Sequence, residues 1–290
     1  MGSATAKRIA LPEDFPWQQS VGLLLDAVQV ERLLPRVFEW DETPRVDVLY
    51  LTTRLAEFRD LSPCLVRLRG AGDPALAQFL EQVDQQWGYL LVSDESWEQV
   101  VAHLRWLTVI EHPSGQEMLL RMAFPPVADA LFGTEYPDSM LFGPCQHIFI
   151  ADLARSGWHR YTRPSEMPPP KHDAPYRFNE KQWDRLHDAS FRKRVTELSR
   201  HMKHYFPDYQ ADLTDQQYRE HLQALARRAV EHGFDCEKEL YLYANAHGFV
   251  DEQGLRKDPD IVSLLDPKSS LPKAQRIERI ADLAQKRCQP

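Results

Sequence analysis

Residues 87–107, "WGYLLVSDESWEQVVAHLRWL", pass from a compact apolar run directly into a segment with helical periodicity. The run over 87–93 has the length and composition of a buried strand. In the segment over 93–107 the apolar residues recur at the spacing of one helix face, and Ser93 or Asp94 is suited to cap the helix N-terminus. A strand followed by an amphipathic helix predicts an α/β architecture for this part of the chain.

The rest of the first half repeats this alternation of strand and helix patterns. A helix is expected over 72–83, because Asp73 is suited to its N-cap and Pro74 to its first position. The segment 108–124 predicts a β-hairpin that turns at Pro113-Ser114-Gly115. These patterns together predict an α/β (α+β) domain over residues 1–162, with a mixed β-sheet flanked by helices. Further strands are expected over 20–28, 45–53, 64–68, 145–152 and 158–164, and further helices over 29–40 and 125–133.

The second half of the chain has a different pattern. Residues 163–176, "RPSEMPPPKHDAPY", contain five prolines and no apolar periodicity, which predicts a Pro-rich linker. Beyond the linker helical periodicity dominates, and residues 177–290 are expected to form a small all-α C-terminal domain. Helices are expected over 180–206 as a pair, over 214–233 with a glycine at the end, over 235–248 with Asp235 as the cap, and over 270–287.

Composition and charge narrow the class of protein. The chain of 290 residues has 43% hydrophobic and 27% charged residues, as in ordinary soluble globular proteins, and no apolar run reaches the roughly 20 residues of a membrane span. The first residues lack the apolar stretch of a signal peptide, so a cytoplasmic protein without membrane contact is expected. Residues 1–158 carry 12 Lys and Arg against 22 Asp and Glu, a net charge of −10, which argues against binding to nucleic acid.

Two stretches of the sequence contain histidines at spacings that a metal site could use. In "HMKH" two histidines lie three residues apart, and "VEHGFDCEKELYLYANAHGF" over 230–249 brings two histidines and a cysteine close in sequence. The favoured interpretation is a solvated helix face and two helix ends, so we predict no catalytic residue, no metal ligand and no cofactor. The alternative, a metal-dependent hydrolase, would use His201, His204 and an acid such as Glu197, or His232, Cys236 and His247.

Aromatic residues are frequent in the helical half. Tyr241 and Tyr243 fall on different faces of one expected helix, so at least one of them should lie near the surface. Large aromatic side chains with polar tips either fill a small helical core or anchor an interface with another protein. The predicted partner-binding residues are Tyr241, Tyr243, Phe249, Trp183 and Tyr205.

A series of motifs, taken in chain order, resembles a known protein family. "LLLDAVQVERLLPRV", "SPCLVRL", "WGYLLVSDESWEQVVAHLRWLTVIEHPSGQEMLLRMAFPPV" and "LFGP", within residues 20–150, resemble the type VI secretion effector adaptors, or effector chaperones. The pattern "ARRAVEHGFDCEKELYLYANAHGFVDE" followed by "RIERIADL" is similar to the helical extension of many members. The chain departs from the family after the hairpin, where Arg121 is kept but the following residues differ, while Phe149 can substitute for an aromatic that is common after "FGP".

The resemblance implies a non-catalytic cytoplasmic adaptor. Such a protein binds one particular toxic effector and helps to load it onto the VgrG spike or the PAAR tip. The implied partners are therefore a type VI secretion effector and a VgrG or PAAR protein, with neither nucleic acid nor a membrane among them.

Overall fold

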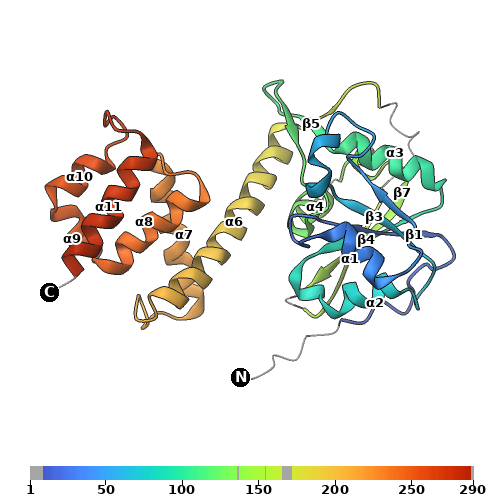
Figure 1. Cartoon of the computed structure of the whole chain (residues 1–290), viewed down its shortest axis with the longest axis horizontal. Coiled ribbons are helices and arrows are strands. Elements are labelled where there is room, and N and C mark those ends of the chain that lie inside the picture. Colours follow the sequence, from blue (N-terminus) through green and yellow to red (C-terminus); the bar gives the residue numbers. More distant parts are fainter. Residues whose placement is uncertain (1–8, 136, 154, 165–171, 289–290) are drawn as a thin grey trace. The chain divides into compact units, whose positions relative to one another are not determined.

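The computed structural model describes residues 9–135, 137–153, 155–164 and 172–288. The chain divides into two compact units, Met1–Ala189 and Ser190–Pro290, and the boundary in the sequence falls within the long helix α6, Glu180–Tyr205 (Figure 1). Of the predicted Pro-rich linker over 163–176, residues 165–171 lie outside the described part of the chain. The domain limits at 162 and 177 remain predictions.

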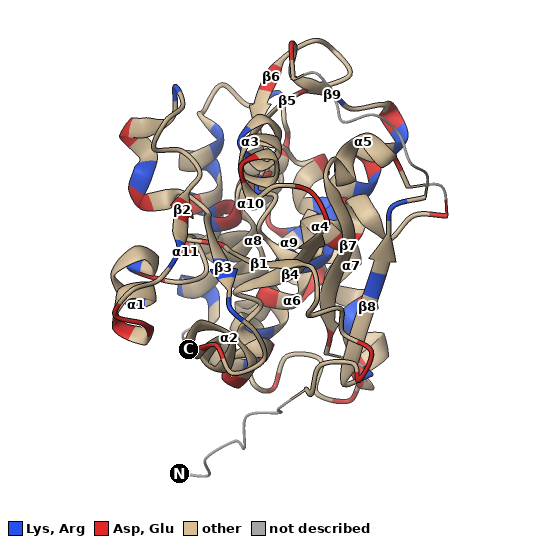
Figure 2. Ribbon diagram, turned by 90° about the vertical axis from the view of Figure 1, so that its right-hand side faces the viewer, with Lys and Arg blue, Asp and Glu red and all other residues tan. Residues whose placement is uncertain are grey.

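The first unit is built on a six-stranded sheet. Its strand order is β2-β3-β1-β4-β7-β8, and each neighbouring pair is antiparallel. The two central strands β1 and β4 carry no charged residue (Figure 2), as expected for strands that are buried on both faces. The strands are β1 Ser20–Leu25, β2 Val46–Val48, β3 Cys64–Leu68, β4 Gly88–Ser93, β7 Cys145–Asp152 and β8 Gly157–Thr162.

Helices cover both faces of this sheet. Alternate residues of a strand point to opposite faces, so Leu24 of β1 belongs to one hydrophobic core and Leu23 and Leu25 to another. Helices α3, α4 and α5 supply the first core, while α1 and α2 supply the second. The helical segments are α1 Leu33–Trp40, η1 Ala56–Leu61, α2 Pro74–Glu81, η2 Val83–Gln85, α3 Trp97–Leu107, α4 Pro125–Phe132 and α5 Ser139–Phe142.

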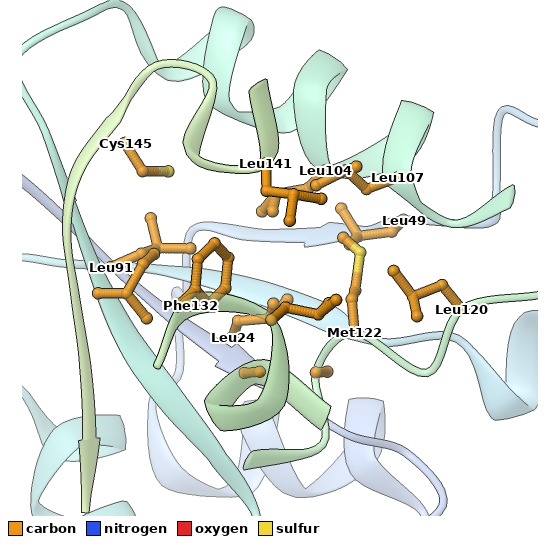
Figure 3. Close-up of a cluster of buried hydrophobic side chains, with 14 of the residues drawn as sticks. Leu24, Leu49, Leu91, Leu104, Leu107, Leu120, Met122, Phe132, Leu141 and Cys145 are labelled. Atoms are coloured by element: carbon orange, nitrogen blue, oxygen red, sulfur yellow. The ribbon is translucent and has the colours of Figure 1, made fainter. Parts of the chain in front are cut away.

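Figure 3 shows the core on the α3 side of the sheet. Leu104 and Leu107 of α3 point toward Leu91 and Leu24 of the sheet and toward Phe132 of α4, and all five side chains are buried. The core also contains Leu120 and Met122, which follow the hairpin. Burial of such side chains, at about 1.5 to 3 kcal/mol each, is the main source of stability for this unit.

Helix α3 begins later than the sequence suggested. Its N-cap is Ser96, whose hydroxyl accepts a hydrogen bond from the backbone N–H of Gln99, while the Gln99 side chain accepts one from the backbone N–H of Ser96. The expected caps Ser93 and Asp94 are therefore wrong. Ser93 ends strand β4 and donates its hydroxyl hydrogen bond to the carbonyl of Pro144 at 2.7 Å. The expected cap Asp73 of α2 is confirmed.

A small second sheet contains the expected hairpin. Strands β5 Val109–Glu111 and β6 Glu117–Leu119 pair in antiparallel register, and β9 Tyr176–Arg177 pairs with β5 in parallel. The mixed pairing expected for this half thus occurs in the second sheet. An α+β first half followed by an all-helical region confirms the expected fold class.

The second unit is entirely helical. Instead of the expected helix pair over 180–206, one continuous helix α6 enters the unit, and Cys236 rather than Asp235 is the N-cap of α8. Arg276 of α11 is buried, and its guanidinium donates to the carbonyls of Leu264, Asp266 and His232 at 2.8 to 3.1 Å. These bonds join α11 to the ends of α7 and α10. The helices after α6 are α7 Asp215–Glu231, α8 Glu237–Phe249, α9 Glu252–Lys257, α10 Pro259–Leu265 and α11 Lys273–Cys288.

The hydropathy of the helices agrees with the composition. Within the described ranges, every helix is either too short or too polar to cross a lipid bilayer.

Candidate partner-binding surfaces

The connection between α7 and α8 decides where the histidines of 230–249 lie. Gly233 has φ +88°, a left-handed conformation that ends α7 directly after its C-cap His232. Cys236 then starts α8, and Glu239 accepts hydrogen bonds from the backbone N–H groups of Asp235 and Cys236. The turn therefore directs the two histidines and the cysteine to separate places.

These three residues do not converge on one point. The His232 ring bonds through Nδ1 to the carbonyl of Leu265 at 3.0 Å, and Cys236 is exposed. The Tyr243 ring contacts both imidazoles, with centroids 5.9 Å from His232 and 4.9 Å from His247. In the described part of the chain, no three His, Cys, Asp or Glu side chains are grouped so that they could hold a metal ion. The geometry gives the hydrolase alternative no support.

The histidines of "HMKH" belong to a row of stacked rings. His201 lies parallel to Tyr241, with ring centroids 4.7 Å apart and an interplanar angle of 4°, and its Nε2 bonds to Oδ1 of Asn245 at 2.6 Å. Tyr205 contacts His201 at 4.7 Å and His204 at 4.6 Å. We call Tyr241, His201, Tyr205 and His204 the aromatic ladder. It runs from α8 across α6, and its rings come from two helices that pack together.

The aromatic ladder is open to solvent at one end and supported at the other. Tyr205 is 64% exposed, which is unusual for a large aromatic residue. Tyr241 is half-buried, and burial first and Glu237 second raise the pKa of its hydroxyl to about 12. The Tyr241 hydroxyl is therefore uncharged at neutral pH. The ladder offers flat aromatic faces of the kind that anchor protein interfaces.

The other predicted partner-binding residues lie in different surroundings. Tyr243 is 4% exposed and packs in the helical core, so it supports α8 and presents no face to a partner. Phe249 is half-buried against Phe206, with ring centroids 5.0 Å apart. Trp183 belongs to the first unit, where it contacts His112 edge-on at 4.3 Å. Only Tyr205 and Tyr241 lie together on one surface, and a binding role for any of these residues remains a prediction.

Two cavities open in the helical unit, and His247 and Glu252 line both. One of about 400 Å³ is mainly apolar, with Leu255, Val262 and other aliphatic side chains of α9 and α10. The other, of about 460 Å³, has mainly polar and aromatic residues of the α6–α7 connection and α8. Neither cavity was expected from the sequence, because their walls come from segments far apart in the chain.

In the first unit, Arg121 takes part in a buried ion pair. Its Nε donates to Oδ2 of Asp26 at 2.7 Å, and its Nη2 donates to Oε1 of Gln29 at 3.2 Å. Asp26 is 3% exposed and also accepts a hydrogen bond from the backbone N–H of Val28. The guanidinium lies over the ring of Phe124 at 4.5 Å. Asp26 therefore acts as a hydrogen-bonding residue directly after strand β1.

The first unit also has exposed apolar side chains that sequence reasoning missed. On α1, Leu33 and Val37 are buried, whereas Leu34 and Phe38 are 37% and 51% exposed. The pair is spaced i, i+4 and forms one outward stripe on the helix. Near the edge strand β2, Leu51, Phe58 and Leu61 are about half exposed. The sequence indicates these exposed residues because the short helix α1 has apolar residues on its outward face as well as on its buried face.

Comparisons with known proteins identify the family of this chain. The family model described as "Domain of unknown function (DUF4123)" matches residues 23–138. The accessory protein VasW of Vibrio cholerae serotype O1 (strain ATCC 39315 / El Tor Inaba N16961) is 30% identical over 280 residues, which cover 92% of this chain and 88% of VasW. The chain belongs to the DUF4123 family, the type VI secretion effector adaptors. No solved structure matches it.

The two comparisons cover different parts of the chain. The DUF4123 match covers strands β2, β3 and β4 and the Asp26–Arg121 pair, and it ends before strands β7 and β8. The similarity to VasW extends over nearly the whole chain, so it includes the helical unit with the aromatic ladder. The resemblance noted from the motifs is thereby confirmed.

Proposed function

We propose that the protein is a cytoplasmic, non-catalytic adaptor that binds one type VI secretion effector and helps to load it onto a VgrG or PAAR spike protein. The helical unit binds the effector, and the first unit contacts the spike protein. The observation that carries the proposal is the exposed aromatic ladder in a chain whose DUF4123 family supplies accessory proteins of this secretion system.

The physical character of the surfaces supports a transient adaptor. A loader has to release its effector, so its interfaces should be modest in area and partly polar. The aromatic ladder fits this requirement because its tyrosine and histidine rings combine apolar faces with polar tips. Exposed Leu34 and Phe38 on α1 give the first unit a separate, smaller apolar surface.

The proposal is tested by co-purification from a bacterium with an active type VI system. The tagged full-length protein is isolated, its partners are identified by mass spectrometry, and zinc is measured on the same sample. Recovery of one toxin-like protein together with VgrG or PAAR supports the adaptor function. Recovery of neither, with about one zinc ion per chain, contradicts it and favours the metal-dependent hydrolase.

A further inference from the structure

The more polar cavity of the helical unit has a composition that points to a class of ligand. It measures about 460 Å³, which is room for more than one side chain of a bound segment. We call it the acidic pocket. Its lining residues are Tyr205, Phe206, Pro207, Asp208, Tyr209, Gln210, His221, His247, Gly248, Asp251 and Glu252.

The charged residues of the acidic pocket are all of one sign. Among the described residues that line it, three are carboxylates and none is Lys or Arg. Glu252 is neutralised by Arg228 and Arg256, each at 2.6 Å. Asp251 caps α9 by accepting from the backbone N–H of Gly254, and neither it nor Asp208 forms an ion pair within the described part of the chain. Two carboxylates are thus left to balance a positive charge from outside.

Aromatic rings form the remaining wall of the acidic pocket. Tyr205, the exposed tyrosine of the aromatic ladder, lines the pocket together with Phe206 and Tyr209. Gly248 is needed here, because a Cβ at this position would lie 2.5 Å from the Phe206 ring. Aromatic faces combined with carboxylates attract cationic groups, through the ring quadrupole and through charge.

A buried histidine supplies an acceptor in the same wall. His247 is 7% exposed, and its ring nitrogens have no hydrogen-bond partner among the described residues. Burial first and Arg228 second lower its pKa to about 4, so the ring is neutral at physiological pH. The neighbouring His221 has a lowered pKa for the same reasons and bonds through Nε2 to the Tyr209 hydroxyl at 2.8 Å. A neutral imidazole accepts an N–H donor and does not repel a cation.

We propose that the acidic pocket receives a lysine or arginine side chain of the effector, next to the aromatic ladder. This inference rests on the proposed adaptor function and deepens it. The cation lies against the Tyr205 face, Asp208 and Asp251 balance its charge, and His247 accepts one of its N–H groups. The pocket therefore adds a charge requirement to an aromatic surface that is otherwise selective only for shape.

The first test uses small probes and needs no effector. N-acetyl-arginine amide and N-acetyl-lysine amide are titrated into the full-length protein while the histidine imidazole resonances are followed by NMR. N-acetyl-norleucine amide serves as the uncharged control. The cationic probes should shift the His247 signal saturably and bind at least about fivefold more tightly than the control, with weakening at high salt. Equal binding of the norleucine probe would overturn the charge requirement.

Two exposed residues allow a matched pair of variants. Asp208→Asn removes a carboxylate from the acidic pocket, whereas Asp212→Asn makes the same change nearby in the same connection but outside the lining. Asp208→Asn should weaken the cationic probes by about threefold or more, and Asp212→Asn should leave them unchanged. Equal effects of the two variants would show a general surface charge effect and refute the pocket.

Co-purification separates this inference from the adaptor function itself. If the wild-type protein recovers an effector and Asp208→Asn recovers less of it, both proposals are supported. If both proteins recover equal amounts, the acidic pocket is not the contact, while the adaptor function stands. If the wild-type protein recovers no type VI protein, the adaptor function fails, and so does an effector side chain as the occupant, whatever the probes show.

Discussion

The two units of this protein bury their polar and aromatic groups in different ways. In the first unit the charged pair Asp26–Arg121 is locked between strand β1 and the segment after β6, and both faces of the sheet are covered by helices. In the helical unit Tyr205 of the aromatic ladder is 64% exposed, and the buried His247 has no hydrogen-bond partner among the described residues. The helical unit thus offers an aromatic face and an unpaired acceptor for recognition, which supports its proposed role in effector binding.

All seven tryptophans lie in the first unit, so the two units can be followed separately. Tryptophan fluorescence reports the unfolding of the sheet unit, and helical ellipticity reports both units. We expect two transitions in a denaturant titration, since separate cores unfold as separate units.

Loss of the buried ion pair should destabilise only the first unit. Arg121→Ala leaves the Asp26 carboxylate buried without its cation, which should lower the free energy of unfolding by about 3 kcal/mol. Tryptophan fluorescence should show the shift, and the transition of the helical unit should not move. Arg54→Ala is the control, because its ion pair with Glu117 is exposed and should contribute less than about 1 kcal/mol.

Acid should weaken both units through one buried histidine in each. Burial is the main cause that lowers the pKa of His103 in the first unit and of His247 in the helical unit to about 4, against 6.5 in the unfolded chain. Between pH 6.5 and about 4 the unfolded chain binds a proton that the folded chain does not, so stability is lost as the pH falls. At pH 5 each unit should lose about 2 kcal/mol relative to pH 7.

A variant distinguishes this effect from general acid destabilisation. His247→Gln should flatten the pH dependence of the unfolding transition of the helical unit between pH 7 and 5. The pH dependence of the first unit's transition, followed by fluorescence, should not change. Unchanged pH dependence of both transitions would show that other groups dominate. The measurement is denaturant unfolding at the two pH values.

Replacement of Gly248 should destabilise the helical unit and leave the stability of the first unit unchanged. Gly248→Ala places a methyl group against the Phe206 ring, and we expect a loss of about 1 to 2 kcal/mol even though alanine favours a helix. Gly72→Ala, where no atom lies within 4 Å of the added Cβ, should change stability by less than about 0.5 kcal/mol. An equally small effect at Gly248 would show that the Phe206 ring moves aside freely.

Tyr241→Ala should weaken binding of the effector and should have no measurable effect on the fold of the first unit. Removal of one ring of the aromatic ladder should reduce effector affinity by about tenfold, as for a moderate interface anchor. Titration of purified effector, once identified, gives the affinity. Phe38→Ala on α1 is the control for loss of an exposed aromatic side chain in the other unit.

The sequence predicted the frame of the molecule well. Alternation of apolar runs with amphipathic segments identified the strands and helices around the sheet, and Asp73 and Gly233 marked a helix start and a helix end. Local signals misplaced other boundaries. Ser96, three residues after Ser93, is the N-cap of α3. Cys236 is the N-cap of α8, a role that cysteine rarely has, because Glu239 accepts a hydrogen bond from its backbone N–H.

The candidate surface was only partly predictable. Helix spacing predicted that at least one of Tyr241 and Tyr243 lies near the surface, and Tyr241 is half-buried whereas Tyr243 faces the helical core. The stacking of His201 on Tyr241 and the lining of the acidic pocket depend on tertiary contacts between distant segments. Local periodicity carries no information about such contacts.

The most direct measurement compares the type VI proteins that co-purify with three versions of the full-length chain. These are the wild type, Tyr205→Ala/Tyr241→Ala in the aromatic ladder and Leu34→Ala/Phe38→Ala on α1, each quantified by mass spectrometry. We predict that the wild type recovers one effector with VgrG or PAAR, that the ladder variant loses the effector, and that the α1 variant keeps it. Effector recovery that survives the ladder variant, or a wild type without any type VI partner, would contradict it.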